Sequence, residues 1–131
     1  MIQTYEDAFN ALKIDTSNLN NELANYAVQF VEIAQLEAQA KAAAVQAKFA
    51  YEQARERAIL TLRADKTKTM TVAQVEAAAN TSSTVTVLES AMQMADANHR
   101  RFAAVLNGFE RRHTMLEQLS ARETQSRRHA R

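Results

Sequence analysis

Apolar residues recur at alternating steps of three and four positions from residue 19 to residue 62, and no Gly or Pro interrupts them. These positions are Leu19, Leu23, Tyr26, Phe30, Ile33, Ala40, Ala44, Ala47, Tyr51, Ala54 and Ala58. Such a spacing places them on one face of an α-helix with a coiled-coil-like surface. We therefore predict a long helix over residues 16–64. In a protein most of the stability of such a helix comes from packing of its apolar face, so it requires a packing partner along this face.

A second apolar seam predicts another long helix, over residues 84–122. Its positions are Leu88, Met92, Ala95, Phe102, Leu106, Phe109, Leu116 and Leu119. Between the two long helices, residues 65–84 form a polar connector. Within it, Thr71 and Gln74 have the spacing of a capping box, which predicts a short helix after them.

The two ends of the chain differ in character. Residues 1–14 predict a short N-terminal helix or arm with Thr4 as its N-cap. The tail, residues 123–131, is basic and has no apolar residue beyond Ala, so we expect it to be disordered. Together the elements predict an all-α fold, a long antiparallel helical hairpin with a short N-terminal helix, in one helical domain spanning residues 1–122.

Bulky apolar side chains are scarce for a chain of 131 residues. The hydrophobic fraction is 47%, but 26 of these residues are Ala and only 35 are Val, Ile, Leu, Met, Phe or Tyr. An elongated helical chain with so few bulky residues completes its core by associating with further copies. We therefore predict a closed, ring-like homo-oligomer of more than two subunits.

Several classes of function have no support in the sequence. The absence of Cys excludes disulfides, Cys nucleophiles and zinc ribbons, and no apolar run reaches the roughly 18 residues of a membrane span. The acidic N-terminal segment is no secretory signal. His99 and His113 lie about 20 Å apart along a helix, too far to share a metal ion. We therefore expect a cytoplasmic protein that is not an enzyme and needs no cofactor.

The cations are concentrated in the second half of the chain. Residues 1–65 carry six Lys or Arg and nine Asp or Glu, net −3, whereas residues 66–131 carry ten and six, net +4. Arg100, Arg111 and Arg122 are 11 residues apart, and each step drifts only about 20° around a helix, so the three form a stripe. Arg101 and Arg112 repeat this spacing on a neighbouring face. Arginine provides rigid paired donors for phosphate oxygens, so we predict nucleic-acid contact along this helix.

A second set of candidate residues precedes the connector and continues into it. Lys48 and Arg55 are seven residues apart with Tyr51 between them, an aromatic residue between two cations. This combination suits single-stranded nucleic acid, whose backbone follows the charges while its bases stack on rings. Lys66 and Lys68 in the connector are further candidates. The alternative is that these cations form a solvated helix face and that Tyr51 belongs to the apolar seam.

Three segments carry a resemblance to a known family. The first is Ile14-Asp15-Thr16-Ser17-Asn18-Leu19 with Glu22, Ala24 and Asn25, an Ile-Asp pair and a hydroxyl-rich cap before a long helix. The second is Ala47-Lys48 with Tyr51, a basic-aromatic segment. The third is Leu106 with Phe109-Glu110-Arg111-Arg112 and Leu116, a closing helix. In this order the three are similar to the UvsY-type recombination mediators of tailed phages.

The resemblance implies a phage protein that acts in the cytoplasm of the infected bacterium as a DNA recombination or annealing mediator. Such a mediator binds single-stranded DNA, contacts the single-strand-binding protein that coats it, and helps to load a recombinase or strand-annealing protein. The resemblance also implies a ring, and specifically a heptamer.

Two other readings of the same helical pattern remain open. One is a coiled-coil interaction protein of a secretion or flagellar export system, built as a monomeric or dimeric hairpin. The other is a virion-assembly or scaffolding protein, which forms large assemblies and is indifferent to DNA. Neither requires an exposed arginine stripe.

Overall fold

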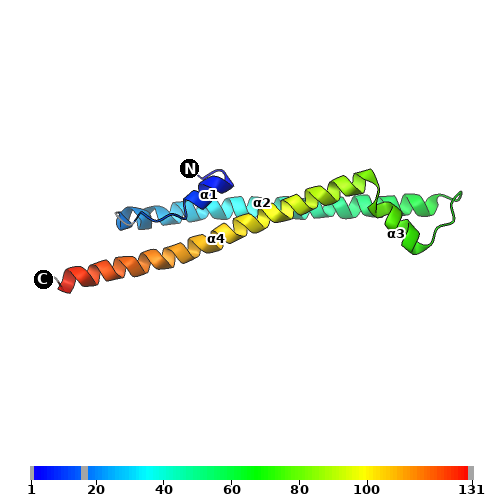
Figure 1. Ribbon diagram of the computed structural model, residues 1–131. Helices are drawn as coiled ribbons and strands as arrows, with labels where there is room; N and C mark the ends of the chain where they lie inside the picture. Colours follow the sequence, from blue (N-terminus) through cyan, green and yellow to red (C-terminus); the bar gives the residue numbers. More distant parts are fainter. Residues whose placement is uncertain (1, 16–17, 130–131) are drawn as a thin grey trace. The chain divides into compact units, whose positions relative to one another are not determined.

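The computed structural model describes residues 2–15 and 18–129, which form four helices (Figure 1). They are α1 (Tyr5–Asn10), α2 (Leu19–Ala64), α3 (Val72–Asn80) and α4 (Ser83–His129). About 86% of the described residues are helical and none of them forms a strand, which confirms the all-α prediction. None of the helices in these ranges is both long and apolar enough to cross a membrane.

The chain divides into two compact units, and both long helices contribute a segment to each. Unit 1 contains the chain up to Gln39 together with the part from Arg100 onward, and unit 2 contains Ala40–His99. Unit 1 therefore holds α1, the first part of α2 and the last part of α4, whereas unit 2 holds α3 and the remaining segments of α2 and α4.

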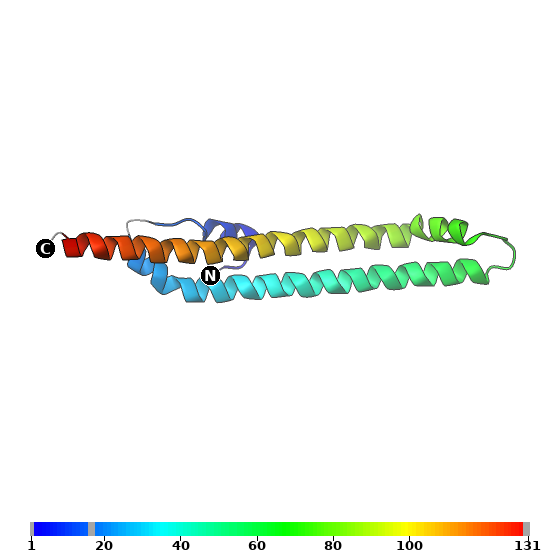
Figure 2. The same cartoon turned by 90° about the horizontal axis from the view of Figure 1, so that it is seen from below.

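The core of unit 1 joins three helices. Ala8 of α1, Ile33 of α2, and Val105 and Phe109 of α4 are buried together. Figures 1 and 2 show α1, in blue, beside the unit 1 segments of α2 and α4. A capping box begins α1, because the Asp7 N–H donates to the Thr4 hydroxyl and the Asp7 carboxylate accepts from the Thr4 N–H. The predicted N-cap at Thr4 is thereby confirmed.

Within unit 1, α2 and α4 run in opposite directions. Glu22 of α2 pairs with Arg112 of α4, and one turn further along α2 the ring of Tyr26 stacks on that of Phe109, with centroids 5.1 Å apart. Rising residue numbers on α2 thus meet falling numbers on α4. The antiparallel pairing predicted for the two long helices holds inside this unit.

The core of unit 2 is built where α3 packs on α2. Ile59 of α2 is buried against Val75 and Ala79 of α3. The Thr71 hydroxyl accepts from the Gln74 N–H and the Gln74 side chain accepts from the Thr71 N–H, at 3.2 and 2.9 Å. The predicted short helix and its capping box are confirmed. Because α3 lies inside unit 2, the connector between the long helices is part of the packed structure.

Two of the predicted boundaries concern the start of the first long helix and the end of the second. The predicted start of the first long helix at residue 16 lies outside the described residues, and α2 begins at Leu19. The tail from residue 123 was expected to be disordered, and this is wrong up to His129, where α4 ends. Residues 121–129 are exposed, but they contain no Gly or Pro. Arg127 also pairs with Glu123 one turn earlier at 2.6 Å, which supports a helix without an apolar face.

Candidate nucleic-acid interface

The predicted arginine stripe, Arg100, Arg111 and Arg122, lies on α4 within unit 1. All three side chains are exposed. Their spacing of 11 residues corresponds to three turns with a drift of about 20° per step, so they follow one line along the helix. Consecutive members are about 16 Å apart along the helix axis. The stripe therefore places three exposed arginines on one face of a single helix.

The local charge is positive because the acidic residues of this segment are few. Residues 100–129 carry seven arginines and three glutamates, net +4. Two of the glutamates have partners on their own helix, since Glu117 pairs with His113 at 2.8 Å and Glu123 with Arg127 at 2.6 Å. Glu110, directly before Arg111, and Glu123, directly after Arg122, are the acidic residues nearest in sequence to the stripe.

Arg101 is exposed, but its guanidinium lies over an aromatic ring. Its Cζ atom is 4.1 Å from the centroid of the Tyr5 ring on α1. This distance is within the range of a cation–π contact, in which the guanidinium keeps its charge and its outer edge. Arg101 therefore combines two features, a cation at the surface and a stacking contact with α1.

Arg112, which was also predicted to contact nucleic acid, is buried in unit 1. The residue is only 5% exposed, and its Nη2 atom pairs with the Glu22 carboxylate and donates to the Lys13 carbonyl at 3.2 Å. Burial lowers the pKa of the Arg112 guanidinium from its ordinary value. The helical spacing places Arg112 on the same face as Arg101, but the segment that follows α1 covers that face at this position. Arg112 is thus a link between α4, α2 and that segment.

The remaining predicted residues lie in unit 2. Lys48, Lys66 and Lys68 are exposed. Tyr51 is half-buried in the seam, and Arg55, also half-buried, donates from Nε to Asn80 Oδ1 at 2.9 Å. Arg55 is therefore partly used to hold α3 against α2. The structure groups the five predicted arginines in unit 1 and these five residues in unit 2.

Two aromatic residues on α1 were not among the site residues predicted from the sequence. Tyr5 contacts Arg101, and its ring stacks on that of Phe9 with centroids 6.2 Å apart. Phe9 is 53% exposed. The spacing of four between Tyr5 and Phe9 was visible in the sequence, but nothing in it indicated that α1 lies against the arginine-bearing part of α4.

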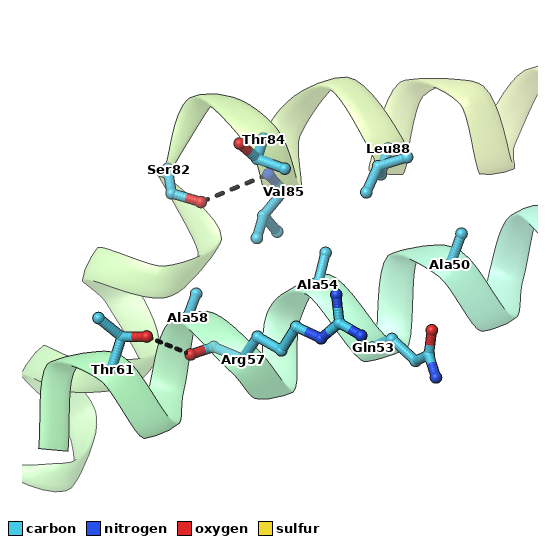
Figure 3. A pocket seen from close by; sticks show the side chains of 10 residues that line it. All are labelled: Ala50, Gln53, Ala54, Arg57, Ala58, Thr61, Ser82, Thr84, Val85 and Leu88. Atoms are coloured by element: carbon cyan, nitrogen blue, oxygen red, sulfur yellow. Dashed lines mark hydrogen bonds between the residues drawn. The ribbon is translucent and has the colours of Figure 1, made fainter. Parts of the chain in front are cut away.

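A pocket of about 470 Å³ lies in unit 2 between α2 and α4 (Figure 3). It is lined by Ala50, Gln53, Ala54, Arg57, Ala58, Thr61, Ser82, Thr84, Val85 and Leu88. The Thr61 hydroxyl donates to the Arg57 carbonyl at 2.8 Å, and the Ser82 hydroxyl accepts from the Val85 N–H at 3.4 Å. These bonds are local helix contacts. The lining contains no His, Asp, Glu or Cys that would activate a hydroxyl as a nucleophile.

Metal binding has no support in the described ranges either. Residues 2–15 and 18–129 contain no group of three or more His, Asp or Glu side chains arranged to hold a metal ion. The exposed arginines of α4, with the α1 aromatics beside Arg101, are therefore the arrangement with the clearest binding chemistry.

No protein-family model, curated protein or solved structure matches the chain. The function is therefore inferred from the side chains themselves and from the resemblance noted in the sequence.

Proposed function

We propose that this protein is a DNA recombination or annealing mediator without enzymatic activity. It binds single-stranded DNA and helps to load a recombinase or strand-annealing protein onto DNA coated with single-strand-binding protein. The observation that carries the DNA-binding part is the exposed arginine stripe of Arg100, Arg111 and Arg122 on α4. The recombination role, the partner proteins and the cytoplasm of a phage-infected bacterium come from the resemblance to the UvsY-type mediators.

The stripe is suited to the phosphate backbone and carries no means of reading sequence. Arginine binds phosphate oxygens through paired N–H donors, and each contact releases condensed counterions from the DNA. Binding of this kind is independent of sequence and strongly dependent on salt. This is the behaviour required of a protein that acts on any single strand.

Assembly into a ring is part of the same proposal, with seven subunits favoured through the resemblance. A feature of unit 2 supports association. Val45, Phe49 and Leu60 of α2 are 63%, 60% and 62% exposed. They lie within about 60° of one another around the helix, and the exposed Glu52 and Glu56 share this face between Phe49 and Leu60, so the three apolar side chains form an interrupted line. A second copy that covered this line would remove it from water, and a ring would repeat the arginine stripe around its circumference.

Single-strand affinity measured at two salt concentrations, together with the mass from light scattering, tests the proposal. We expect an oligomer above a dimer that binds single-stranded DNA more weakly at the higher salt. A monomer, or an oligomer that does not bind single strands at either concentration, would overturn the proposal.

The second candidate is a coiled-coil interaction protein of a secretion, export or virion-assembly system that does not bind DNA. The observation that favours it is the same exposed apolar line of Val45, Phe49 and Leu60, which a partner helix would cover equally well. Assembly into an oligomer without binding to DNA would favour this second candidate over the first.

A further inference from the structure

Three flat groups lie in contact on the surface of unit 1. The Arg101 guanidinium is 4.1 Å from the Tyr5 ring centroid, and the Tyr5 ring is stacked with that of Phe9 at 6.2 Å and an interplanar angle of 27°. The edge of the Phe102 ring meets Tyr5 at 6.0 Å and 84°. Tyr5 is thus fixed from α4, and it supports Phe9 at the outside of the set.

Phe9 does not pack into the core of unit 1. It is 53% exposed, and it is absent from the residues packed around Ala8, Ile33, Val105 and Phe109. Tyr5, in contrast, is among the partly buried residues that pack against this core. A phenyl ring that is stacked on another ring at the protein surface can stack a further planar group on its exposed face.

The aromatic pair lies beside the arginine stripe. Around α4, Arg100 is 100° from Arg101, and Arg111 is about 80° from it in the same sense. The core residue Phe109 is about 80° from Arg101 in the opposite sense. Arg101, with Tyr5 over it, therefore lies between the core and the stripe, so α1 flanks the line of exposed guanidinium groups.

Of the two acidic residues of α1, Asp7 faces away from the aromatic pair and Glu6 lies at its edge. Asp7 is about 160° from Tyr5 around the helix, and its carboxylate accepts from the N–H groups of Gln3 and Thr4. Glu6 is about 60° from Phe9. Phosphate is thus favoured at the arginines of α4, and an uncharged planar group is favoured at Phe9.

We infer that Phe9, supported by Tyr5 and Arg101, is a platform on which a base of single-stranded nucleic acid stacks while the adjoining backbone lies on the arginine stripe. This assignment rests on the proposed DNA binding and adds a site to it. It also replaces Tyr51, which is half-buried in unit 2, as the stacking residue. Every base has a flat face, so the platform is indifferent to sequence and does not conflict with backbone binding.

The test compares two probes of equal length, an oligothymidylate and a phosphodiester oligomer without bases. The full-length protein is used as the wild type and as the variants Phe9→Leu, Phe9→Trp and Val31→Ala. Phe9→Leu keeps an apolar side chain but removes the ring, and Phe9→Trp keeps a ring. Val31, on α2 of unit 1, has the same exposed fraction as Phe9, 53%, and serves as the matched control.

We expect the wild type to bind oligothymidylate more tightly than the base-free probe. Phe9→Leu lowers the oligothymidylate affinity about fivefold or more and leaves the base-free affinity unchanged. Phe9→Trp and Val31→Ala retain both affinities. Because the chain contains no Trp, Phe9→Trp also introduces a single indole, whose fluorescence oligothymidylate alters and the base-free probe does not.

Each of the other outcomes overturns the stacking platform. Equal wild-type affinity for the two probes overturns the platform but leaves the proposed backbone binding in place. A loss of both affinities in Phe9→Leu, or of neither, also overturns it, the first because Phe9 would then act only through the fold. If the wild type binds neither probe, the proposed function fails and the platform fails with it.

Discussion

Arg112 and Glu22, which are 90 residues apart in the chain, form an ion pair inside unit 1. Their side chains are only 3% and 16% exposed, and the Lys13 carbonyl accepts a further hydrogen bond from Arg112. The pair joins α4 to α2 and to the segment that follows α1. Arg112 therefore has a structural role, unlike the exposed arginines on the same helix.

Removing one partner of this pair leaves a buried charge without its counterion, so each single variant is destabilised. We expect Arg112→Leu and Glu22→Leu each to lower the free energy of unfolding by about 3 kcal/mol. The Nε and Nη1 atoms of Arg112 are buried and have no hydrogen-bond partner in the described chain, so the pair is incompletely satisfied. The double variant is therefore expected to recover most of the loss, as measured by urea unfolding. Additive losses in the double variant would show that the two residues are not coupled.

Gly108 can be replaced by Ala with a gain in stability. It lies inside α4, and its φ is not positive. A Cβ at this position would be 3.4 Å from Leu12 Cδ2, which is an ordinary contact. Ala in a helix interior is more favourable than Gly by about 0.5–1 kcal/mol. We expect Gly108→Ala to raise the melting temperature in thermal unfolding followed by circular dichroism. A lower melting temperature would mean that Leu12 cannot accommodate the methyl group.

We expect acid to weaken the start of α1 through Asp7. The Gln3 N–H is the largest contribution that lowers the pKa of this carboxyl below its ordinary value of 3.8, followed by the Thr4 side chain. A lowered pKa in the folded state stabilises the fold above pH 4 and loses this effect as the pH falls through the folded value. Asp7→Asn keeps an acceptor oxygen but does not titrate. We expect the variant to lose less stability than the wild type between pH 5 and pH 2, as measured by urea unfolding, and an equal loss in both would contradict this role.

The elements of the fold were predictable because their signals are local. The seam beginning at Leu19 and the capping box of Thr71 and Gln74 depend on residues within a few turns of one another, and both predictions are confirmed. The tail prediction was wrong because the absence of apolar residues was taken as evidence for disorder. Charged residues such as Glu123 and Arg127 support a helix through contacts one turn apart.

The candidate interface was predictable only in part, because tertiary packing decides which residues of a helix face remain exposed. The spacing of Arg101 and Arg112 correctly implies a shared face of α4, but one carries the Tyr5 ring and the other is buried. Phe9 was missed for the same reason. The apolar pattern places it on one side of α1, and it does not specify that α1 packs beside the basic part of α4.

The salt dependence of single-strand binding tests the central claim most directly. The variant is Arg111→Ala with Arg122→Ala, and the control is Arg57→Ala with Arg63→Ala, which removes the same charge from exposed positions on α2 of unit 2. We expect the slope of log affinity against log salt to flatten by about 1.4 in the variant, about 0.7 for each lost phosphate contact. The control keeps the wild-type slope, and light scattering gives the same oligomer mass for all three proteins. If the variant retains the wild-type affinity and slope with its oligomer intact, the arginine stripe is not a DNA-binding surface.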